Sequence, residues 1–124
     1  MTFDFAAYLD LADQLATGQS ESCYRSATSR AYYAFYHLVG RAAVRQDPNL
    51  SAFFYSGPGH GKFFSELQKS SCALKGLAQT GHTLRGYRNQ ADYDKKHMTI
   101  AQAQNQAELA CELARQQLKK YRLV

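Results

Sequence analysis

Residues 21–46 read ESCYRSATSRAYYAFYHLVGRAAVRQ, and this segment sets the architecture because it contains a single helix-breaking residue, Gly40. Its apolar side chains recur at helical spacing, which predicts one long helix with one core face. Ala27 and Ala31, four residues apart, would let a neighbouring helix approach closely. The predicted core face consists of Tyr24, Thr28, Ala31, Phe35, Leu38 and Ala42.

The segment before this helix also has helical spacing. Phe5, Tyr8, Ala12 and Leu15 repeat at three and four residues until Gly18 interrupts the pattern, which predicts a helix over residues 3–17. On the other side of the long helix, residues 46–61 hold both prolines of the chain and three of its glycines, so we expect a loop there.

Three more helices follow the predicted loop. A short one is expected over residues 62–69, and a longer one over 72–93, where Leu77, Leu84 and Ala91 lie seven apart. The glycines of this longer segment leave room for a break in its first half. A last helix opens with Thr99-x-x-Gln102, the pattern of a capping box.

No stretch alternates in the manner of a half-buried strand, and the chain has few Val and Ile. The length of 124 residues suits one domain with one core. The predicted fold class is therefore all-α, an antiparallel bundle of four to five helices forming a single domain over residues 1–124.

The net charge of +5 is unevenly distributed along the chain. Residues 1–24 carry Asp4, Asp10, Asp13 and Glu21 and neither Lys nor Arg, so the rest of the chain is strongly basic. Such a balance favours contact with phosphates or docking of the acidic first helix on a basic neighbour, although an idle surface can carry it too.

The cysteines and histidines do not form a recognisable metal site. Cys23, Cys72 and Cys111 are isolated and odd in number, which favours free thiols in a reducing cytoplasm over disulfides or a thiolate zinc site. The four histidines lack the i, i+4 pairing and companion carboxylates of a metal centre. With neither a signal peptide nor a long apolar run, the sequence predicts a cytoplasmic protein without membrane, metal or cofactor.

The 72–93 helix carries the most informative polar surface. Arg88 borders the apolar face, where its stem would be partly covered and its guanidinium held as a fork for phosphate or carboxylate. The alternative is that Arg88 and Asp92, four apart, form an ordinary surface pair. The arc beside Arg88 on the helical wheel consists of His82, Arg85, Asn89, Asp92 and Tyr93.

Two further segments are weaker candidates for binding. Opposite its core face, the 21–46 helix has a polar arc that is either solvated or functional, and it consists of Ser26, Arg30, Tyr33, His37 and Arg41. The loop over residues 57–62 is rich in glycine but lacks the GKS or GKT ending and preceding strand of a phosphate-binding loop, which favours a connector.

Two motifs and one weaker match resemble small prokaryotic members of the HEPN domain family. Residues 29–37, SRAYYAFYH, are similar to the second-helix signature, and residues 88–93, RNQADY, resemble the later Arg-Asn-x-Ala-Asp-Tyr segment. His60-Gly61 followed by Phe64 is similar to the element before the third helix of the family. The resemblance covers about residues 20–120 and implies a homodimer with the Arg88 segment near the dimer cleft.

The resemblance implies two functions. The first is a metal-independent RNA endonuclease of a toxin-antitoxin or defence system, in which Arg88, Asn89, Asp92 and Tyr93 are catalytic. The second is a non-catalytic module that binds a nucleotide or a partner such as a nucleotidyltransferase antitoxin. In either case Arg30, Tyr33, His82 and Arg85 are the expected RNA- or nucleotide-binding residues.

The sequence departs from the family's catalytic motif, an Arg followed after four to six residues by a His. Tyr93 stands where the shortest spacing would place the histidine, and His97 comes too late. A tyrosine phenol is a weaker general base than imidazole at neutral pH. We favour the endonuclease narrowly, because Arg, Asn, Asp and Tyr together exceed what plain docking requires.

Overall fold

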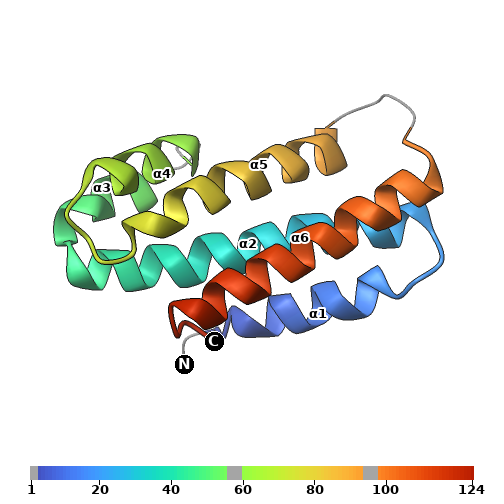
Figure 1. Cartoon of the computed structure of the whole chain (residues 1–124), viewed down its shortest axis with the longest axis horizontal. Helices are drawn as coiled ribbons and strands as arrows, with labels where there is room; N and C mark the ends of the chain where they lie inside the picture. The colour runs from blue at the N-terminus through green and yellow to red at the C-terminus, as the bar shows by residue number, and fades with distance from the viewer. Residues whose placement is uncertain (1–2, 56–59, 94–97) are drawn as a thin grey trace.

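The structure is a computed structural model that describes residues 3–55, 60–93 and 98–124, with only the backbone of residues 60–61. Four long helices run along the molecule (Figure 1): α1 (Ala6–Ala16), α2 (Glu21–Gln46), α5 (Ala78–Tyr93) and α6 (Ile100–Lys120). Between α2 and α5 lie α3 (Ser51–Phe54), α4 (His60–Lys69) and two 3₁₀ turns, η1 (Pro48–Leu50) and η2 (Lys75–Leu77). The described part of the chain contains no strand, which confirms the all-helical class.

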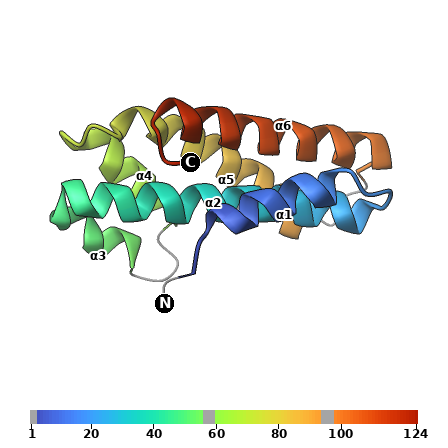
Figure 2. The ribbon, with the colours of Figure 1, turned by 90° about the horizontal axis from the view of Figure 1, so that it is seen from below.

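The helix α2 is the centre of the bundle. It packs against α1, α5 and α6, and Figures 1 and 2 show α1 and α5 running antiparallel to it while α6 runs in its direction. The short helices α3 and α4 lie at the end of the bundle where α2 finishes. The described residues form six α-helices that pack together, one more than the upper bound of four to five, because α3 forms within the segment expected to be a loop.

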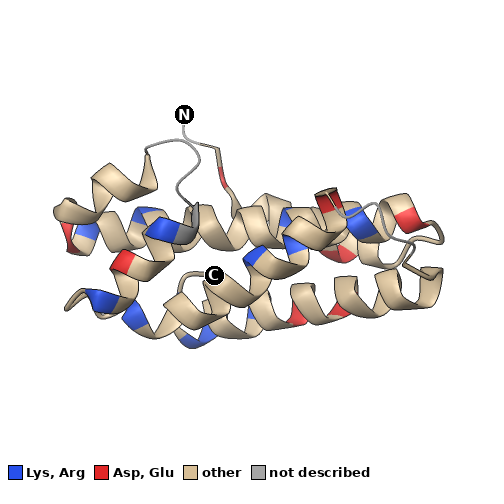
Figure 3. Ribbon diagram, turned by 90° about the horizontal axis from the view of Figure 1, so that it is seen from above, with Lys and Arg blue, Asp and Glu red and all other residues tan. Residues whose placement is uncertain are grey.

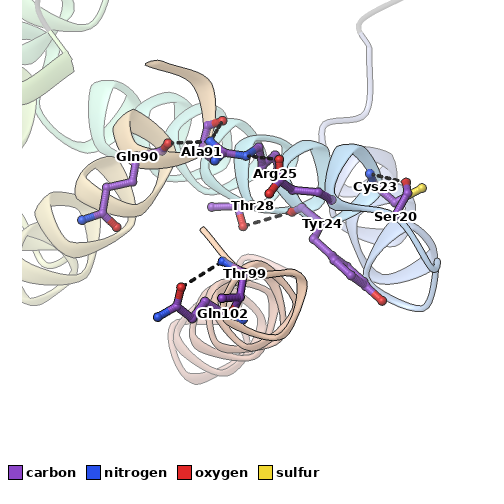
Figure 4. Close-up of polar contacts among 10 residues, drawn as sticks. Ser20, Cys23, Tyr24, Arg25, Thr28, Gln90, Ala91, Thr99 and Gln102 are labelled. Atoms are coloured by element: carbon purple, nitrogen blue, oxygen red, sulfur yellow. Dashed lines mark hydrogen bonds and ion pairs between the residues drawn. The ribbon is translucent and has the colours of Figure 1, made fainter. Parts of the chain in front are cut away.

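Side-chain caps explain several helix limits. Ser20 accepts a hydrogen bond from the backbone N–H of Cys23 at 3.2 Å and starts α2 at the predicted residue. The capping box predicted from Thr99 and Gln102 is present at the start of α6 (Figure 4). Helix α2 extends to Gln46, the predicted limit, and the next element begins at Pro48.

Helix α5 begins later than the predicted residue 72. The backbone N–H of Cys72 donates to Ser70 Oγ at 3.2 Å, and the Cys72 thiol lies 3.5 Å from the backbone nitrogen of Leu74. These local bonds compete with a helical ladder, and a 3₁₀ turn replaces the first turns of the predicted helix. The predicted 72–93 helix is therefore interrupted in its first half, as its glycines allowed.

The buried face of α2 is wider than the predicted stripe. Tyr32, Phe35 and Val39 are fully buried, whereas Leu38, expected in the core, is only partly buried. The reason is that α2 is covered on three sides, by α1, α5 and α6. Helices α2 and α6 pack against each other, and both carry buried alanines that are small enough for close approach: Ala27, Ala31, Ala103, Ala107, Ala110 and Ala114.

Acidic side chains of α1 form ion pairs with a basic residue of α6. Arg115 of α6 forms ion pairs with Asp10, at 3.2 Å, and with Asp13. This contact accounts for part of the charge asymmetry seen in the sequence. Among the described residues, no helix is both long enough and apolar enough to cross a lipid bilayer.

Candidate functional site

Arg88 lies on the side of α5 that faces α2, and only 8% of it is exposed. Its guanidinium carbon is 5.1 Å from the ring centroid of Tyr32, 5.6 Å from that of Tyr33 and 5.5 Å from that of Tyr93. Its Nη1 donates a hydrogen bond to the Tyr93 hydroxyl at 3.1 Å. Three phenol rings thus surround one cation, an arrangement in which ring faces stabilise positive charge.

The positive charge of Arg88 is not matched by a carboxylate in the described part of the chain. Asp92, the alternative partner suggested by spacing, instead accepts a hydrogen bond from the Ser29 hydroxyl of α2. The Nε of Arg88 is buried and has no hydrogen-bond acceptor among the described residues. An ordinary Arg88–Asp92 surface pair is therefore not what the structure contains.

Tyr32 and Arg85 extend this polar layer. Tyr32 is fully buried, and desolvation raises the pKa of its phenol well above the usual value even though the charges of Arg88 and Arg85 act in the opposite direction. The phenol is thus protonated at neutral pH. Arg85 is half-buried, and its Nε also lacks an acceptor within the described residues. Figure 3 shows the positions of Lys and Arg along α5 and along α2, the helix on which α5 packs.

The end of α5 that carries the site is fixed by a residue that sequence analysis missed. Arg25 of α2 donates from Nη1 to the carbonyl oxygens of Gln90, at 3.0 Å, and Ala91, at 2.9 Å (Figure 4). A cation at a helix C-terminus is favourable because the last carbonyls lack helical partners. The available signal was the four-residue spacing of Arg25, Ser29 and Tyr33, which places them on one side of α2.

The other residues of α5 that were predicted to belong to the site lie at different distances from Arg88. Asn89 is half-buried, and Tyr93 is 67% exposed at the last position of α5. His82 lies six residues before Arg88, about 9 Å along the helix, with its ring 5.9 Å from that of Phe64 in α4. The structure therefore brings Tyr93 into contact with Arg88, whereas Asp92 bonds to Ser29 and His82 lies farther along α5.

The second polar arc, on α2, is partly covered by aromatic residues from the start of the chain. The guanidinium of Arg30 lies 5.8 Å from the ring of Tyr8 in α1, so it faces α1 rather than Arg88. The ring of His37 stacks on Phe5 at 4.0 Å, and burial together with the charge of Arg41 lowers its pKa. From this arc, the ring of Tyr33 contacts the Arg88 guanidinium.

Other candidates lie elsewhere or outside the described residues. His97 and the loop residues 57–59 belong to the parts that the structure does not describe. A surface hollow of about 280 Å³ between α5 and α6 contains none of the predicted site residues; it is lined by Tyr87, Leu109, Glu112, Leu113 and Gln116. Within the described ranges, no group of three or more His, Cys, Asp or Glu side chains could hold a metal ion.

The site is thus a guanidinium fork held by phenols at the α2–α5 contact, suited to binding an anion. Comparisons with protein-family models, with curated proteins and with solved structures found no match. The resemblance to HEPN proteins is accordingly carried by the sequence motifs of residues 29–37 and 88–93, whose side chains meet in this site.

Proposed function

We propose that this chain is a HEPN-type module that binds the phosphate of an RNA or a nucleotide through Arg88. The observation that carries the proposal is the buried guanidinium without a carboxylate partner among the described residues. Burying an unpaired charge is costly, and in the described part of the chain the cost is offset only by phenol rings and one hydroxyl. An anionic ligand would supply the missing counter-charge.

The surroundings of Arg88 favour a nucleic-acid ligand over a simple carboxylate. Tyr93, at the rim of the site, exposes an aromatic ring on which a base can stack next to the bound phosphate. The net charge of +5 adds long-range attraction for polyanions. Together these features support phosphate recognition coupled to base stacking.

The resemblance supports further parts of the same proposal. A homodimer would place two Arg88 sites near one cleft, and a nucleotidyltransferase antitoxin would be the partner protein. A cytoplasmic location agrees with the free thiols of Cys23, Cys72 and Cys111. Size-exclusion chromatography with light scattering tests the dimer: a monomeric mass at micromolar concentrations would remove that part of the proposal.

Fluorescence anisotropy with a labelled oligoribonucleotide tests the binding function. The Arg88→Lys variant keeps the charge but loses the planar fork, so we expect affinity to fall at least tenfold. Arg45→Gln is the matched control, because Arg45 is an exposed arginine in the last turn of α2, outside the site. Equal affinity of wild type and Arg88→Lys, with both folded by circular dichroism, would refute the proposal.

A second candidate function is metal-independent RNA cleavage, and one observation favours it. The Tyr93 hydroxyl lies 3.1 Å from Arg88 Nη1, so a group that can relay a proton adjoins one that can offset developing phosphate charge. Asn89 and Asp92 would orient the site. Incubation with varied RNAs in EDTA tests this candidate: cleavage that disappears in Arg88→Ala would support it, and intact RNAs throughout would eliminate it.

A further inference from the structure

We infer that the Arg88 site takes a terminal phosphate, the phosphomonoester at the end of an RNA or on a mononucleotide, rather than the internal phosphodiester of a continuing strand. This inference rests on the proposed phosphate-binding function and narrows its ligand. Three features support it: the positive charge of the site, the low solvent exposure of Arg88, and the position of Tyr93 at the end of α5.

The charge of the site favours a doubly charged ligand. Arg85 and Arg88 lie three residues apart on α5, so their side chains leave the same side of the helix. Neither forms an ion pair within the described residues, and each has a buried Nε without an acceptor there. The Asp92 carboxylate, one helical turn from Arg88, accepts a hydrogen bond from Ser29 of α2.

Two neighbouring cations attract a ligand in proportion to its charge. A terminal phosphate carries about 1.5 to 2 negative charges near neutral pH, because its second pKa is about 6. An internal phosphodiester carries only one. The pair of arginines therefore favours the terminal group over the internal one.

The enclosure of the site points in the same direction. Arg88 is 8% exposed and Tyr32 is completely buried, so the guanidinium is open to solvent only over a small area. An internal phosphate is flanked by a nucleoside on each side and needs a groove that is open at both ends. A terminal phosphate has a nucleoside on one side only and can enter end-on.

Tyr93 is the part of the enclosure that can move. It is the last residue of α5, and at 67% exposure it is far less buried than Tyr32. A phosphate oxygen can replace its hydroxyl as the acceptor for Arg88 Nη1. The displaced ring then lies at the entrance, where it can stack on the single base that follows the terminal phosphate.

Isothermal titration calorimetry with one short RNA sequence in three forms tests the inference: without a terminal phosphate, with a 5′-phosphate and with a 3′-phosphate. The titrations use the whole chain in about 0.15 M salt, where long-range attraction is screened. We expect one phosphorylated form to bind at least tenfold more tightly than the unphosphorylated RNA, and the 5′ and 3′ arms identify the end.

Arg85→Gln should reduce this preference at least threefold, because it removes one of the two cations while Arg88 remains. Arg45→Gln should keep the preference unchanged. Equal affinity for all three forms, still lost in Arg88→Lys, would overturn the terminal-phosphate inference and leave the proposed function intact. Absence of binding to all three forms would overturn both.

Discussion

Replacing Tyr93 with phenylalanine separates the two functions proposed for this site. The substitution removes the hydroxyl that accepts the hydrogen bond from Arg88 Nη1 at 3.1 Å and keeps the aromatic ring. If a phosphate takes the place of that hydroxyl, Tyr93→Phe frees the arginine in advance and tightens binding. If the hydroxyl relays a proton during RNA cleavage, the same change abolishes cleavage.

The magnitude follows from the strength of that hydrogen bond. Hydrogen bonds to charged groups contribute about 1.5 to 3 kcal/mol, and water competes for a side chain that is 67% exposed, so about 1 kcal/mol is appropriate here. Because a factor of ten in affinity corresponds to about 1.4 kcal/mol, we expect binding to tighten about fivefold. The free energy of unfolding should fall by about 1 kcal/mol.

Fluorescence anisotropy with a terminally phosphorylated RNA measures the first effect, and urea unfolding measures the second. Tyr55→Phe is a matched control, because Tyr55 is 68% exposed and lies directly after α3, away from the site. The control should change neither quantity. Affinity that falls tenfold in Tyr93→Phe would show instead that the hydroxyl itself contacts the ligand, and displacement of the hydroxyl by phosphate would be excluded.

Three other substitutions test the scaffold around the site. Arg25→Ala removes two hydrogen bonds to the C-terminal carbonyls of α5 and should lower the free energy of unfolding by about 1 to 2 kcal/mol in urea titrations, with an unchanged value arguing against the cap. Gly81→Ala places a methyl group against the ring of Phe64 and should cost about 1 to 3 kcal/mol by the same assay, whereas a neutral or stabilising effect would show that α4 can shift. Because burial and Arg41 lower the pKa of His37 below its usual 6.5, the unfolded chain binds the proton more readily, so stability should decrease as pH falls through about 6.5. His37→Gln should weaken that decrease in thermal melts, and an identical pH dependence would exclude His37 as a source.

Local sequence signals predicted those features that depend on one helix at a time. The limits of α2 and the capping box of α6 agree with the structure, because spacing and caps act within a few residues. The helical wheel also placed Arg88 at the border of the apolar face, in agreement with its low exposure.

Contacts between helices could not be predicted in this way. Asp92 lies four residues from Arg88 in sequence, but the packing of α5 on α2 brings the Ser29 hydroxyl to it instead. Likewise, the position of Arg25 at the end of α5 depends on the register between the two helices, which no single-helix pattern encodes. The late start of α5 followed from side-chain bonds of Ser70 and Cys72 that compete with the helix.

NMR of the arginine Nε–Hε groups reports on whether the covered guanidinium of Arg88 is the group that receives the anion. In a titration with terminally phosphorylated RNA, we expect the Arg88 Nε–Hε signal to shift in proportion to site occupancy while that of Arg45 stays in place. An Arg88 signal that does not move when the RNA is bound would contradict this expectation.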